Sequence, residues 1–182
     1  MIRIVEKSGD RHMGQRATKD PAYDFVENPN PLDIIEQTAE NQRFPYERNA
    51  DCELILLSGG KWTDQRLCFT FLPDCEALQL MLIFEPRVPE RHIEEVLRLI
   101  ARMNANNWLG HFDYLSDEQL VLFRYGMPLR DSDLTVAQST DLIELALEAC
   151  DSFFPALQYV LWGGMKADDA VSASLFETAG EA

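Results

Sequence analysis

The sequence contains few of the residues from which catalytic and metal sites are usually built. It has three histidines and four cysteines in 182 residues, and no cysteine forms a CxxC pair or lies near a histidine at zinc-finger spacing. We expect reduced cysteines of a cytoplasmic protein rather than a disulfide framework. Motifs of metalloproteases, EF-hands, zinc deaminases, nucleophile elbows and phosphate-binding loops are also absent. The sequence therefore predicts no cofactor, no metal site and no enzyme.

Long apolar runs are missing as well. No run approaches the roughly 20 residues that a helix needs to cross a bilayer, and the N-terminal residues lack the apolar segment of a secretory signal. The chain is nevertheless 46% hydrophobic, which excludes full disorder, and its length favours one domain. Residues 1–29 show no sustained helical or strand period, so we expect a flexible N-terminal extension before a domain over residues 30–182.

Basic residues are scarce, and their distribution is uneven. The formal net charge is −15, from 16 Lys and Arg against 31 Asp and Glu. Residues 1–30 carry five bases and five acids, so residues 31–182 hold the whole excess. Such a body repels phosphate backbones and anionic lipids, which argues against nucleic-acid and membrane partners. It favours basic protein partners, although the alternative is a merely solvated acidic surface.

Hydrophobic periodicity predicts three helices and five strands in the body of the chain. Asn30 and Pro31 are expected to cap the first helix, Ser132 or Thr135 the last long one, and Pro155 to kink that helix or break it in two. Helices are expected over residues 30–41, 89–103 and from 135 to about 162, a short tail helix over 167–178, and strands over 52–57, 62–72, 78–84, 108–115 and 120–129.

The order α-β-β-β-α-β-β-α plus a tail helix predicts an α+β fold. Consecutive hairpins favour a mainly antiparallel five-stranded sheet with helices on one face, a two-layer sandwich. Gly59 and Gly60 suggest a tight hairpin with positive φ angles. The strand over 78–84 is apolar on nearly both faces, so we expect it to be central or to be covered by a partner, such as a second subunit.

A few residues are candidates for chemistry or contact. His111 and Asp113 could project from one sheet face, and an enzyme assembled around His111 with Arg124 remains an alternative, as does a regulator of transcription. A structural role as a half-exposed strand pair is favoured over the enzyme, and the acidic charge argues against a regulator that contacts DNA. The three tryptophans stand at the ends of predicted elements, where they serve either as core edges or as anchors for a protein partner.

Several local strings resemble the YbjN-domain family of bacteria, whose members look like type III secretion chaperones. The resemblance runs from about residue 28 to the end. It rests on NPLDIIEQ (30–37), SGGKW (58–62), FEPRVPE (84–90), NNWLGHFDYLSDE (106–118) and FFPALQYVLWGG (153–164).

The resemblance implies a secretion-chaperone-like α+β fold, often homodimeric, in the bacterial cytoplasm. The family is described as regulators of sensory transduction, and it brings no catalytic residues to carry over. We therefore expect a non-enzymatic protein-binding module, chaperone-like or regulatory, that binds a client or partner protein. The candidate partner-binding residues are Trp62, Trp108, His111, Phe112, Arg124 and Trp162.

Overall fold

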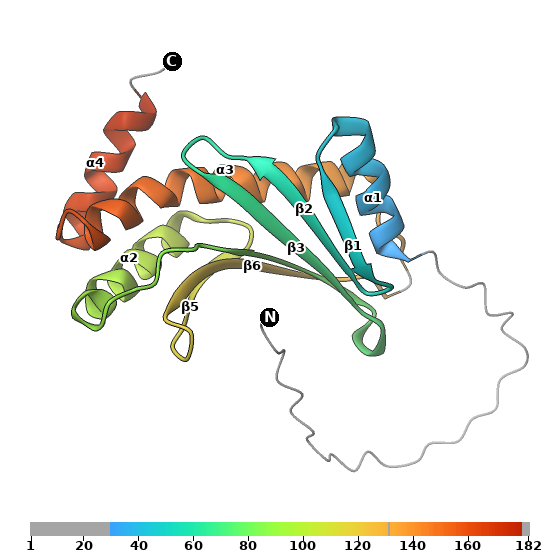
Figure 1. Cartoon of the computed structure of the whole chain (residues 1–182), viewed down its shortest axis with the longest axis horizontal. Helices are drawn as coiled ribbons and strands as arrows, with labels where there is room; N and C mark the ends of the chain where they lie inside the picture. Colours follow the sequence, from blue (N-terminus) through green and yellow to red (C-terminus); the bar gives the residue numbers. More distant parts are fainter. Residues whose placement is uncertain (1–29, 131, 180–182) are drawn as a thin grey trace, which may run out of the picture.

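The computed structural model describes residues 30–130 and 132–179, and Figure 1 shows their arrangement. The predicted extension of residues 1–29 lies outside the described residues. The helices are α1 (Pro31–Gln42), α2 (Ile93–Asn106), α3 (Val136–Leu161) and α4 (Ala167–Ala179), with short 3₁₀ turns η1 (Pro73–Cys75) and η2 (Glu90–His92). The strands are β1 (Tyr46–Ala50), β2 (Glu53–Gly59), β3 (Asp64–Leu72), β4 (Ala77–Ile83), β5 (His111–Leu115) and β6 (Leu120–Pro128).

The sheet has six antiparallel strands in the order β1-β2-β3-β4-β6-β5. The predicted α+β class is confirmed, but the expected count of five strands was wrong by one. The missed strand, β1, reads Tyr-Glu-Arg-Asn-Ala and lies at the sheet edge. Edge strands are often short and charged, so they carry little of the apolar alternation by which a strand is recognised in a sequence.

One face of the sheet forms the core with the helices. A single row crosses five strands through Leu56, Leu67, Leu82, Phe123 and Phe112, each at most 2% exposed. Figure 1 shows α3 crossing behind the strands. Helices α1, α2 and α3 all contribute side chains to this one cluster, including Ile35, Leu99 and Phe153. The helices therefore cover one face, as expected from the two-layer prediction.

Helix termini follow the sequence. The Asn30 side chain accepts a hydrogen bond from the Leu32 amide, and Pro31 occupies the first turn of α1. Thr135 caps α3 in a reciprocal capping box with Gln138. Of the two caps considered for the long helix, the structure thus selects Thr135.

The β2–β3 hairpin is confirmed, but its expected turn was wrong. The loop spans residues 60–63, and neither Gly59 nor Gly60 has a positive φ. Glycine is needed at position 60 for space instead. A Cβ there would lie 2.3 Å from Nε2 of Gln65 and 2.6 Å from the Thr63 carbonyl oxygen.

Pro155 does not divide α3, which runs unbroken from Val136 to Leu161. Proline has no amide N–H, so the Asp151 carbonyl four residues earlier loses its helical donor. The indole Nε1–H of Trp62 donates to that carbonyl at 2.9 Å. The side chain of Asp151 meanwhile accepts hydrogen bonds from the Lys61 amide and from Nε2 of Gln65. The hairpin thus supplies the bond that the proline removes.

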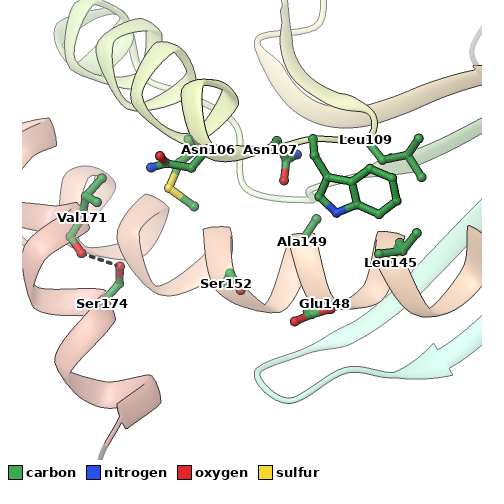
Figure 2. A pocket seen from close by; sticks show the side chains of 11 residues that line it. Asn106, Asn107, Leu109, Leu145, Glu148, Ala149, Ser152, Val171 and Ser174 are labelled. Atoms are coloured by element: carbon green, nitrogen blue, oxygen red, sulfur yellow. Dashed lines mark hydrogen bonds between the residues drawn. The ribbon is translucent and has the colours of Figure 1, made fainter. Parts of the chain in front are cut away.

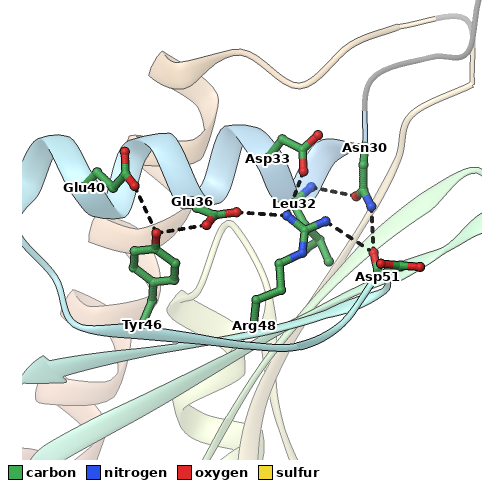
Figure 3. Close-up of polar contacts among 8 residues, drawn as sticks. All are labelled: Asn30, Leu32, Asp33, Glu36, Glu40, Tyr46, Arg48 and Asp51. Carbon is green, nitrogen blue, oxygen red and sulfur yellow. Dashed lines mark hydrogen bonds and ion pairs between the residues drawn. The ribbon is translucent and has the colours of Figure 1, made fainter.

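Strand β1 is held against α1 by a polar network (Figure 3). Arg48 forms ion pairs with Asp33 at 2.7 Å and with Glu36 at 3.0 Å. The Tyr46 hydroxyl lies within hydrogen-bond distance of both Glu36 and Glu40, and donation to Glu36 and Glu40 raises the pKa of Tyr46 to about 12. The carboxylates of Asp33, Glu36 and Glu40 therefore bind the edge strand β1 to α1.

Candidate functional site

Trp108 has the most exposed large apolar side chain among the residues that the structure describes. It lies in the turn between α2 and β5. Its exposed fraction is 79%. The backbone on either side is closely held. The Asn104 side chain exchanges two hydrogen bonds with the backbone of Phe112 on β5, at 2.7 and 2.9 Å. Trp108 was predicted to begin a strand, whereas β5 starts three residues later, at His111.

Gly110 fixes the other end of this turn. Its φ is +68°, and an added Cβ would lie 2.2 Å from the ring of Phe123. Glycine is therefore required both for the left-handed backbone and for the close approach to a core ring. The two constraints together leave the Trp108 indole displayed on a rigid turn.

An open groove runs along α3 on both sides of Trp108. One hollow, of about 340 Å³, reaches α4, and a second, of about 430 Å³, reaches β6. Both hollows share Trp108, Leu109, Leu145 and Glu148, so we treat them as one feature, the Trp108 groove. Figure 2 shows the hollow that reaches α4, with Val171 and Ser174 on one side, Leu109 and Leu145 on the other, and Ala149 between them. The remaining lining residues are Met103, Asn106, Asn107, Tyr125, Met127, Gln138, Asp141, Leu142, Glu144, Ser152, Val171 and Ser174.

The groove has an apolar floor and an acidic rim. Asp141, Glu144 and Glu148 are exposed and succeed one another at spacings of three and four residues, so they share one edge of α3. Leu145 and Ala149 lie beside them, half-buried. No lysine, arginine or histidine lines either hollow. The arrangement presents apolar surface with carboxylates along one side.

The apolar period of α3 does not by itself reveal the groove. Val136, in the first turn, is exposed, whereas Leu142 is buried. Helix α3 has apolar residues on more than one face, because one face meets the sheet and another meets α4 and the groove. That surplus was the available signal in the sequence.

The predicted His111 and Asp113 do project from one sheet face, where they meet Arg124. His111 pairs with Arg124 in the β5–β6 register, and Arg124 forms an ion pair with Asp113. An enzyme built around His111 would need a nucleophile nearby. The cross-strand row that contains His111 and Arg124 continues through Met81 to Cys68, which carries the nearest thiol in that row. Three strand spacings amount to about 14 Å. The row thus holds an ion pair and a distant thiol, whose pKa is raised by burial.

The other predicted contact residues lie outside the groove. Phe112 is 2% exposed and stacks on Phe153 at 4.1 Å between ring centroids, so in this fold it serves the core. Trp62 is half-buried and bonded to α3. Trp162 is 67% exposed and borders a separate hollow of about 210 Å³. Of the six candidates, only Trp108 lines the groove.

Neither a metal centre nor a membrane helix is evident in residues 30–130 and 132–179. No group of three His, Cys, Asp or Glu side chains in these ranges is placed to hold a metal ion. No helix within them is both long and apolar enough to span a bilayer.

Comparison with known proteins gives one family. The profile described as "YbjN: Putative bacterial sensory transduction regulator" matches residues 31–159, a range that contains Trp108 and ends before α4. A search of curated proteins found no match. Among solved structures, the chain is similar to "Crystal structure of YbjN, a putative transcription regulator from E. coli", with 12% identity, a TM-score of 0.49, and coverage of 67% of this chain and 87% of that chain. Because the profile spans most of its length, the chain belongs to the YbjN family.

Proposed function

We propose that this chain is a non-enzymatic protein-binding module, chaperone-like or regulatory, and that it holds a segment of a client or partner protein in the Trp108 groove. The observation that carries the proposal is the exposed indole of Trp108, fixed on a rigid turn over an apolar floor. Exposed tryptophans beside pockets are typical anchors of protein interfaces.

The energetics favour a covered groove. A tryptophan buries roughly 150–250 Å² of surface in an interface. At about 25 cal/mol per Å², covering an indole that is 79% exposed is worth about 3–5 kcal/mol before the costs of association. Leu109 and Leu145 add apolar area on either side of it. This is the size of contribution expected of a hot spot.

The rigid setting of the indole lowers the cost of binding. The two hydrogen bonds between the Asn104 side chain and the Phe112 backbone, and the close approach of Gly110 to Phe123, hold the turn before any partner binds. A backbone that is already ordered loses less conformational entropy on association. The turn is therefore suited to recognition of a partner segment.

Site-specific photo-crosslinking tests the proposal. A benzophenone amino acid at Ser152, an exposed position in the groove, should crosslink a discrete partner in cells. The matched control is the same group at Leu57, on the opposite face of the sheet, where any adduct should be with a second copy of this chain. Crosslinks from position 152 should disappear in the Trp108→Ala background, and mass spectrometry of the adduct identifies the partner segment.

The proposal is overturned by a specific outcome. If positions 152 and 57 give the same adducts, and Trp108→Ala leaves both unchanged, the groove is not the binding surface. A circular dichroism spectrum of the Trp108→Ala variant establishes that the fold is kept, because this exposed side chain contributes little to the core.

A further inference from the structure

We propose that the occupant of the Trp108 groove is a basic client segment, in which apolar anchors enter the two hollows and lysine or arginine side chains face the rim of α3. This inference rests on the proposed function and adds the chemistry of the partner. Two observations carry it. The first is the apolar floor on both sides of one exposed indole, and the second is the lack of cationic partners for the rim carboxylates among the described residues.

Three carboxylates that succeed one another along the groove have no cationic partner among the residues that the structure describes. Asp141, Glu144 and Glu148 form no ion pair with any residue that the structure describes. On α2, in contrast, Glu94 and Glu95 both pair with Arg98. The rim is thus the place where an incoming cation would meet uncompensated negative charge.

The other helices show the same contrast. On α1, Asp33 and Glu36 share Arg48, and on α4 Asp168 pairs with Arg102 at 2.7 Å. The chain has 16 bases for 31 acids. Among the described residues, five helical carboxylates have an ion-pair partner, whereas the three along the groove have none. From Asp131 onward the sequence offers a single base, Lys166, and this lysine pairs with Glu95. No neighbouring base of α3 or α4 therefore competes with a partner for the rim.

The dimensions fit a short segment. The groove-lining residues of α3 run from Gln138 to Ser152, which at 1.5 Å per residue is about 21 Å. That length matches about six residues in extended form or about 14 in a helix. Because the hollows flank Trp108, the segment needs two separated apolar anchors that straddle the indole.

A pair of synthetic peptides tests the inference with the full-length chain. One probe of about 14 residues carries two leucine or phenylalanine anchors and four lysines or arginines. Its twin has the same anchors, with glutamate in place of every base. Fluorescence anisotropy of the labelled peptides gives the two dissociation constants. We expect the basic probe to bind at least about tenfold more tightly, with a preference that declines as salt rises.

Variants locate the effect on the rim. Glu144→Lys with Glu148→Lys should weaken binding of the basic probe about tenfold. The matched control, Glu47→Lys with Glu90→Lys, changes the net charge equally at exposed positions outside the groove, and should change the affinity less than about threefold. Trp108→Ala should weaken both probes, because the indole contacts their anchors.

The outcomes separate this inference from the proposed function. If both probes bind equally and Trp108→Ala weakens both, the charge inference is wrong and the groove still binds protein. The same holds if neither probe binds while the Trp108-dependent crosslink from position 152 persists. If the basic probe binds with equal loss in rim and control variants, its attraction is general and the inference is overturned.

Discussion

The half-buried bond between Trp62 and the Asp151 carbonyl should make a measurable contribution to stability. Trp62→Phe keeps an aromatic ring but removes the Nε1–H donor. The carbonyl then has neither the indole nor, because residue 155 is proline, a helical amide. Leaving a buried acceptor without a partner costs about 1–3 kcal/mol, and this part-buried carbonyl should fall in the lower half of that range. Against a usual total stability of about 5–15 kcal/mol, this loss is readily measured.

If the indole replaces the hydrogen bond that proline removes, the effect of Trp62→Phe should depend on Pro155. In a Pro155→Ala background, the new amide of residue 155 can donate to the Asp151 carbonyl, so removing the indole donor should matter less. Urea unfolding of the four proteins, followed by circular dichroism, completes a double-mutant cycle. We expect Trp62→Phe to cost at least about 1 kcal/mol less in the alanine background.

The cycle also controls for packing. Any cavity left by Pro155→Ala, or by the smaller ring at position 62, occurs in both arms and cancels. If Trp62→Phe costs the same in both backgrounds, within about 0.5 kcal/mol, the indole does not replace the helical bond and the reasoning is refuted.

Three other predictions follow from the same contacts. Gly110→Ala should destabilise the fold by about 2–4 kcal/mol, because it combines a positive φ with a clash against Phe123; Gly126→Ala, where no atom lies within 4 Å, is the matched control, and equal losses in urea unfolding would contradict the account. Hydrogen bonds from Ala167 and Lys166 hold the pKa of Glu95 below its usual value, so its contribution is present above about pH 4.5 and is lost as the pH falls through the lowered value. The protection factors of the α4 amides, which correct for the intrinsic pH dependence of exchange, should therefore fall under acid in the native chain and already be low at neutral pH in Glu95→Gln; a pH profile of protection identical in both proteins would count against this. The homodimer expected from the sequence should form across the open sheet face around Met81, which lies between Cys68 and Arg124 in the strand register; Met81→Arg should lower the mass measured by light scattering to that of one chain, and an unchanged dimer mass would exclude this face.

Much of the fold could be predicted because its signals are local. Asn30-Pro31 marks the start of α1, and alternation over residues 66–71 marks a strand in which Leu67 and Phe69 are buried and Phe71 is half-buried. The edge strand β1 was missed because edges need little apolar alternation. The sequence left a kink or a break at Pro155 open, and it could not exclude the break, because the bond that replaces the lost helical one comes from Trp62, more than ninety positions away in sequence.

The site was less predictable than the fold. The sequence indicated Trp108 as one of three possible anchors, but it gave no reason to prefer it to Trp62, which proves to be bonded inside the structure. The groove combines a turn with parts of α3, α4 and β6, and such a surface exists only after folding. The acidic residues along the rim of α3 can be recognised in the sequence. Whether a basic side chain lies close enough to pair with them can be seen only in the folded structure.

The most direct measurement is the affinity of the partner segment identified by crosslinking, determined by calorimetry for the native chain, Trp108→Ala and Trp162→Ala. Both tryptophans are highly exposed, but only Trp108 lies in the groove. A hot spot worth at least 2 kcal/mol implies a loss of about 30-fold for Trp108→Ala, with little change for Trp162→Ala. Equal affinities for all three proteins would contradict the assignment of the Trp108 groove as a protein-binding site.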